Sequence, residues 1–135
     1  MENKAILFLS HLIPSEIYDE VNRNSKNNMQ DAANALQWHL VEGFNHNLNC
    51  KYDIINFMPI ASFPQYYRKM FIHAGLFSAG TKSQAYNIGF CNIKYLRRYG
   101  IAMSLYKRVN IWCKQNKNKN LKNKGENKLW QNFIM

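Results

Sequence analysis

The stretch Asn28–Gly43, NMQDAANALQWHLVEG, decides the fold because it predicts an amphipathic helix with a defined start. Asn28 can cap the helix, and Asp31 can complete a capping box and interact favourably with the helix dipole. Apolar residues recur at the helical period and predict one buried sector: Met29, Ala32, Ala33, Leu36, Leu40, Gly43 and Phe44. Trp38 lies opposite that sector, so it either contacts another element or partner, or is partly exposed without consequence.

Apolar runs flank this helix on both sides. Ala5–Leu9 precedes it and Asp53–Met58 follows it, so the three segments predict a βαβ unit with parallel strands. A third strand is predicted at Ala85–Cys91. A second amphipathic helix is predicted at Ile101–Asn116, with Ile101, Leu105, Val109, Trp112 and Cys113 on its apolar face. The fold class is therefore α/β.

The connections are less regular. Ile13–Asn27 is predicted to be a long loop, which forms either a lid or a substrate-contacting edge, or else a mobile surface excursion. A short helix is predicted within Pro64–His73. The surrounding segment, Ile60–Thr81, mixes aromatic and basic residues, which can stack on nucleobases or sugars, but the preferred interpretation is a loop that packs its aromatic side chains on the core. Ile93–Tyr99 is predicted to form a helical turn that Gly100 ends.

The positive charge is concentrated at one end of the chain. Lys and Arg number 18 against 8 acidic residues, and residues 94–135 hold eleven of the basic residues and one acidic residue. Residues 117–128 form a Lys/Asn run that predicts disorder or a solvated loop. The hydrophobic residues 129–135 are a candidate fourth strand.

Several classes of protein are excluded by pattern. The three cysteines form no C-x-x-C pair and are predicted to be reduced and buried in a cytosolic protein, and the four histidines make no metal-ligand motif. No run is long enough to span a membrane. GxGxxG, P-loop and G-x-S-x-G motifs are absent, so no cofactor is implied.

The predicted architecture is an incomplete Rossmann-like three-layer domain. Its short parallel sheet has three strands, in the order 3-2-1, or four if the last seven residues add one, and helices flank it. Ligands of such sheets bind beyond the carboxyl ends of the strands, which places Ser10, His11 and Asn92 near a site. For His11, a structural hydrogen-bonded role is the preferred interpretation over a catalytic one.

Four segments together resemble the start of a bacterial glycosyltransferase. The strand Ala5–Ser10, the stretch Met29–Gly43, and Asp53–Pro59 with Asn87–Tyr95 are similar to the amino-terminal part of GT-B enzymes of the retaining family 4 type, which act in surface-polysaccharide synthesis. The resemblance implies an acceptor-side domain at residues 1–116 and a basic tail at 117–135. It further implies a cleft formed by Ser10, His11, Asn28, Met29, Gln30 and Asn92.

The resemblance also implies that transfer needs a second, donor-binding domain, and nothing in the chain matches one. We therefore interpret the chain as a fragment, inactive alone, that meets a nucleotide-sugar and a glycan acceptor only within a full-length enzyme. Family members carry a glycine pair where Asn28 and Met29 stand, which leaves phosphate contact unsupported. The expected location is the cytoplasm, with the basic end suited to peripheral contact with an anionic inner membrane.

Two other functions remain open. The chain could be a stand-alone interaction module whose open sheet edge and Trp38 meet a partner that completes the fold. It could also be a small basic nucleic-acid-binding protein, although no binding motif is present and no specific nucleic acid is expected.

Overall fold

A mixed sheet forms the centre of the computed structural model, which describes residues 5–27, 31–80 and 83–127, the side chains of Ser83 and residues 118–127 excepted. Strands β1 (Ile6–Ser10), β2 (Tyr52–Asn56), β5 (Ser83–Asn87) and β4 (Gly75–Phe77) lie side by side in the order β1-β2-β5-β4. The first three are parallel and β4 is antiparallel to β5. The predicted parallel order 3-2-1 is confirmed, and in the described part of the chain β1 pairs with β2 alone.

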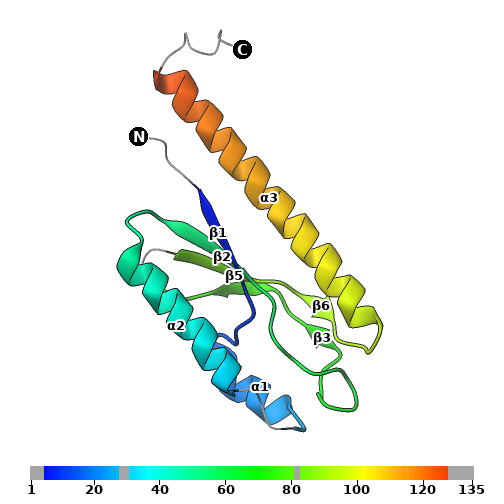
Figure 1. The fold of residues 1–135 in the computed structure, drawn as a ribbon. Helices are drawn as coiled ribbons and strands as arrows, with labels where there is room; N and C mark the ends of the chain where they lie inside the picture. The colour runs from blue at the N-terminus through cyan, green and yellow to red at the C-terminus, as the bar shows by residue number, and fades with distance from the viewer. Residues whose placement is uncertain (1–4, 28–30, 81–82, 128–135) are drawn as a thin grey trace.

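Helices cover both faces of this sheet (Figure 1). Helix α2 (Asp31–Asn47) packs on one face, where Phe44 contacts the rings of Phe8 and Tyr52. Helix α3 (Leu96–Asn127) packs on the other, where the Trp112 indole N–H donates to Asp53 at 2.7 Å. The α/β class with flanking helices is therefore confirmed.

The buried face of α2 is rotated away from the predicted apolar sector, of which Phe44 packs on the core. Leu36 is 60 % exposed and Leu40 is 42 % exposed, whereas Val41 on the other side is buried. Polar side chains of the buried face bond to backbone atoms of neighbouring segments. Asn34 accepts the Ile13 N–H at 2.8 Å, Trp38 donates to the Ile13 carbonyl at 3.1 Å, and Asn45 donates to the Ala79 carbonyl at 3.0 Å. Because hydrogen bonds satisfy these polar side chains, the more polar face of α2 can be buried against the sheet.

Two apolar clusters make the core. One lies between α2 and the sheet and includes Leu12, Val41, Tyr52, Ile54, Ala79 and Ala85. The other lies beyond the carboxyl ends of the strands and includes Ile13, Val21, Met58, Ile60, Tyr67, Ile72 and Phe90. The second cluster packs helix α1 (Tyr18–Asn24) against the rest of the chain.

The predicted loop 13–27 is largely helical. A single 3₁₀ turn η1 (Ser15–Ile17) leads into α1, and Val21 is buried with Ile17 and Tyr18 packed beside it. Tertiary packing of this face stabilises a helix too short to persist alone. The segment is therefore packed against the core and is not a loose excursion, while a role as a lid or a substrate-contacting edge stays a prediction.

The predicted third strand is split after Asn87. Strand β5 ends there, and β6 (Phe90–Cys91) pairs antiparallel with β3 (Phe71–Ile72) in a separate two-stranded sheet. Gly89 lies between them, where an added Cβ would stand 2.8 Å from the Ile72 carbonyl oxygen. The chain can therefore bend across β3 only with a glycine at this position.

Helix α3 is longer than predicted in both directions. It starts at Leu96, passes through Gly100 without ending, and continues to Asn127 through the Lys/Asn run for which a loop or disorder was predicted. Ile101, Leu105, Val109 and Trp112 are half-buried as predicted, while Cys113 is exposed. The candidate strand 129–135 lies outside the described residues.

Three further predictions concern residues 64–73, the cysteines and membrane-spanning segments. Residues 64–73 contain turns and β3 but no helix, and of their aromatic side chains Tyr67 is buried while Phe71 is 60 % exposed. The cysteines are free, but Cys50 is exposed like Cys113. Among the described residues, no helix has the length and apolarity needed to cross a bilayer.

Candidate functional site

Three polar residues align where the parallel strands end. Ser10, Asn56 and Asn87 are the last residues of β1, β2 and β5, and they are paired in register across the sheet. The Ser10 hydroxyl donates to Asn56 Oδ1 at 2.8 Å, and Asn56 Nδ2 donates to Asn87 Oδ1 at 2.9 Å. Asn56 is fully buried. We call this row the carboxyl-edge ladder.

The ladder also anchors the chain that leaves β1. Asn56 Oδ1 accepts the Leu12 N–H at 2.8 Å, and Asn56 Nδ2 donates to the Leu12 carbonyl at 2.9 Å. Both donors of the Asn56 amide and both lone pairs of its oxygen are thereby used. Ser10, predicted as a site residue, is buried in this network and acts as a structural residue at the ligand edge.

His11 lies at the predicted edge but outside the pocket described below. Its ring packs against Phe57 with centroids 4.3 Å apart. Burial lowers its pKa, and the positive charge of Arg97 lowers it further, against a backbone hydrogen bond at Phe57 that raises it. The neutral imidazole is therefore favoured, and the structural role preferred for His11 from the sequence stays a prediction.

Asn92 is fully buried and holds loops together. Its backbone N–H donates to the Met70 carbonyl at 2.6 Å, its carbonyl accepts the Phe63 N–H at 2.8 Å, and its Nδ2 donates to the Ala61 carbonyl at 2.7 Å. Because β5 ends at Asn87, Asn92 does not stand at the carboxyl end of a parallel strand. The remaining predicted site residues, Asn28, Met29 and Gln30, lie outside the described residues.

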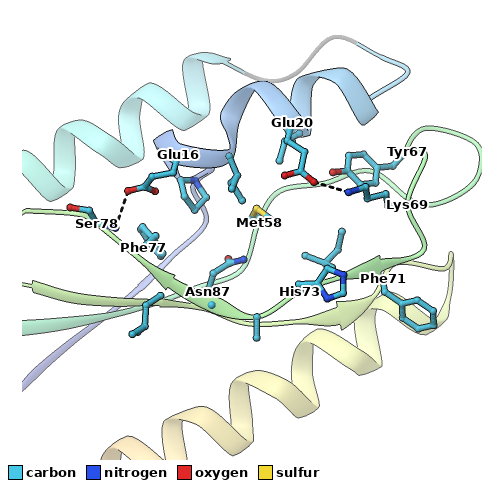
Figure 2. Close-up of a pocket in the computed structure, with 17 residues that line it drawn as sticks. Glu16, Glu20, Met58, Tyr67, Lys69, Phe71, His73, Phe77, Ser78 and Asn87 are labelled. Carbon is cyan, nitrogen blue, oxygen red and sulfur yellow. Dashed lines mark hydrogen bonds and ion pairs between the residues drawn. The ribbon is translucent and has the colours of Figure 1, made fainter.

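A pocket of about 550 Å³ opens beside the ladder (Figure 2). Segment η1–α1 forms one wall, strands β3 and β4 with their connection form the other, and Met58 and Asn87 lie between them. Apolar side chains line much of it, among them Ile17, Val21, Ile72, Leu76 and Phe77. The pocket occupies the place where open α/β sheets bind ligands.

Charged and polar groups stand on both walls. Glu16 and Glu20, one helical turn apart, belong to the η1–α1 wall. Glu16 accepts the Ser78 N–H at 3.2 Å, and Glu20 accepts from the Lys69 ammonium at 2.6 Å. His73 and the Asn87 amide complete the polar set. The pocket thus offers both acceptors and donors around apolar surface.

The electrostatics follow from these pairs. The hydrogen bond and charge of Lys69 lower the pKa of Glu20. Burial raises the pKa of Tyr67, and the negative charge of Glu20 raises it further. At neutral pH Glu20 is therefore ionised, and Tyr67 stays a neutral phenol beside it.

We expect Lys69→Gln to raise the pKa of Glu20 toward its ordinary value. The lysine is the main cause of the lowering, so the ion pair favours the folded protein above that ordinary pKa and this contribution is lost as pH falls through the lowered value. A ¹³C carboxyl NMR titration measures the change. Arg68→Gln, an exposed neighbour absent from the pair, is the control, and an unmoved Glu20 pKa in Lys69→Gln would contradict the pairing.

Sequence reasoning missed the residues that line the pocket. Asn87 was placed inside a strand, because the apolar run continues to Cys91 without an obvious break. Glu16 and Glu20 carried a usable signal, since their spacing puts both carboxylates on one helical face if 15–24 is helical. His73 and Lys69 reach the pocket only through the β3–β4 fold.

The described residues include no group of three or more His, Cys, Asp or Glu side chains that could hold a metal ion. No protein-family model matches the chain, and neither a curated protein nor a solved structure matches it.

Proposed function

We propose that this chain is the acceptor-side Rossmann-like domain of a GT-B glycosyltransferase of the family 4 type, and that the pocket receives a sugar unit of the acceptor. The observation that supports this most is the position of the pocket beyond the carboxyl ends of β2 and β5. The proposal also rests on the sequence resemblance, which covers the same strands and helix α2.

The chemistry of the pocket suits an uncharged saccharide. A sugar ring presents hydroxyl groups around its rim and C–H groups on its faces. Glu16 and Glu20 can accept from hydroxyls, the Asn87 amide and His73 can donate, and Leu76 and Phe77 offer apolar contact. A volume of about 550 Å³ lies in the range of small-molecule sites.

The same charges disfavour a nucleotide-sugar in this pocket. Two carboxylates face one lysine, and Lys69 is already paired with Glu20 at 2.6 Å. A diphosphate would add negative charge beside Glu16 and Glu20, which repels it. Donor binding is therefore assigned to a second domain, as the resemblance implies.

We expect millimolar binding of methyl hexosides or disaccharides, detected as amide shifts in ¹⁵N NMR spectra of the chain at Glu20, Met58, His73 and Asn87. Glu20→Ala should weaken the affinity at least about tenfold, because a hydrogen bond to a charged group contributes about 1.5–3 kcal/mol. Glu42→Ala is the matched control, since Glu42 is also an exposed, paired carboxylate but lies on α2. Shifts confined to other surfaces, or equal affinity of Glu20→Ala, would overturn the proposal.

The other two functions stay predictions. Among the described residues no strand pairs with the outer side of β1, and Leu9 of this strand is 52 % exposed, which supports the interaction module. Trp38 does not support the interaction module, because its indole is half-buried and its N–H donates to the Ile13 carbonyl.

A further inference from the structure

The outward face of α3 carries large apolar side chains in solvent. Tyr99 is 71 % exposed, Tyr106 is 70 % exposed, Met103 is 61 % exposed and Leu96 is 55 % exposed. Their spacing of three, four and three residues places them along one side of the helix. We call these four residues the α3 stripe.

The opposite side of α3 is the one that holds the sheet. Ser104 donates to the Gly89 carbonyl at 2.8 Å, the Arg108 guanidinium lies 3.9 Å from the centroid of the Tyr86 ring, and Trp112 bonds to Asp53. These contacts fix the rotation of the helix. The α3 stripe therefore points away from the domain.

Basic residues surround the stripe without acidic neighbours. Arg98, Lys107, Lys114 and Lys117 are exposed, and residues 94–117 of the helix and its approach contain no Asp or Glu. A helix with exposed Tyr, Leu and Met between lysines and arginines has the composition of segments that lie in a membrane interface. Tyrosine is also the side chain favoured at headgroup depth.

We propose that the α3 stripe and its flanking basic residues dock the protein on the surface of an anionic lipid bilayer. The apolar side chains enter the headgroup boundary, and the lysine and arginine side chains bind lipid phosphates. This inference uses a surface distinct from the pocket and does not depend on the proposed transferase function.

Charge complementarity favours a bilayer over two other occupants. A second copy packed on the stripe would bring two basic helix faces together with no Asp or Glu in residues 94–117 to pair with them, and like charges repel. A nucleic acid would use the tyrosines for stacking and the lysines for phosphates, but Leu96 and Met103 cannot stack on bases. An anionic bilayer uses both the charges and the aliphatic side chains.

Vesicle co-sedimentation of the full chain tests the proposal. We expect binding to phosphatidylcholine vesicles that contain phosphatidylglycerol, weak binding to phosphatidylcholine alone, and weakening with added salt. The double variant Lys107→Gln/Lys114→Gln should bind roughly 25-fold more weakly, about fivefold per lysine. Met103→Ser/Tyr106→Ser should reduce binding at least about tenfold.

Matched variants elsewhere on the surface are the controls. Lys51→Gln/Arg68→Gln removes the same charge outside α3, and Leu36→Ser/Leu40→Ser removes exposed apolar side chains from α2. Both should bind like the parent chain, and circular dichroism should show all four variants folded. Equal losses in the control variants, or no vesicle binding, would overturn the proposal. The proposal would also be overturned if the chain formed a dimer, or bound single-stranded RNA, instead of binding vesicles, and if Met103→Ser/Tyr106→Ser abolished that complex.

Discussion

Asn56→Leu is expected to lower the free energy of unfolding by about 4 kcal/mol or more. The leucine is close in size, but it removes the partner of four groups at once: the Ser10 hydroxyl, the Leu12 N–H and carbonyl, and Asn87 Oδ1. Each buried polar group left unpaired costs about 1–3 kcal/mol. Asn56 is fully buried, so water cannot replace these bonds without opening the sheet edge.

Urea unfolding followed by circular dichroism measures the loss. Asn49→Leu is the control, since Asn49 is exposed and its replacement should stay within about 0.5 kcal/mol. Asn87→Ala removes one bond of the carboxyl-edge ladder and should cost less than Asn56→Leu. A stability of Asn56→Leu equal to that of the Asn49 control would show that the ladder does not hold the sheet edge.

Trp38→Ala should destabilise the fold by about 3 kcal/mol, whereas Leu36→Ala on the same helix should change it by less than about 0.5 kcal/mol. The Trp38 indole packs against the core cluster between α2 and the sheet. Its ring lies edge-on to the Phe77 ring, with centroids 6.5 Å apart, and its N–H donates to the Ile13 carbonyl. Leu36 is 60 % exposed and loses little on truncation.

The comparison works because the two residues lie on opposite sides of α2. Helix propensity changes little between them, since both variants introduce alanine, the best helix former. Thermal and urea unfolding monitored by circular dichroism give the two free energies. A larger loss for Leu36→Ala would mean that the apolar sector packs on the sheet, as the sequence periodicity predicts.

Part of the candidate site was predictable because it depends on chain order alone. Parallel strands bring their carboxyl ends to one edge, so a residue that ends a correctly delimited strand is placed without knowing the fold. Ser10 was placed at that edge on this basis. Asn87 was not, because the bend at Gly89 depends on contact with the Ile72 backbone, which is distant in sequence.

The pocket walls depended on contacts that periodicity does not encode. Glu20 pairs with Lys69, which lies 49 residues later in the sequence, and Glu16 accepts from the backbone N–H of Ser78, which lies 62 residues later. The η1–α1 segment, with Glu16 in η1 and Glu20 in α1, forms because Val21 is buried by distant side chains. A short helix of this kind has no local signal strong enough to identify it.

The sequence by itself determined the α/β class, the positions of β1 and β2, helix α2 and the first half of α3, and the parallel order β1-β2-β5. These features follow from local apolar runs, helical periodicity and the right-handed crossover. Only the tertiary structure decided which face of α2 is buried, where β5 ends, and how the pocket closes. In each case the deciding groups are polar atoms or backbone segments that find partners far along the chain, and such partners are fixed by packing rather than by local pattern.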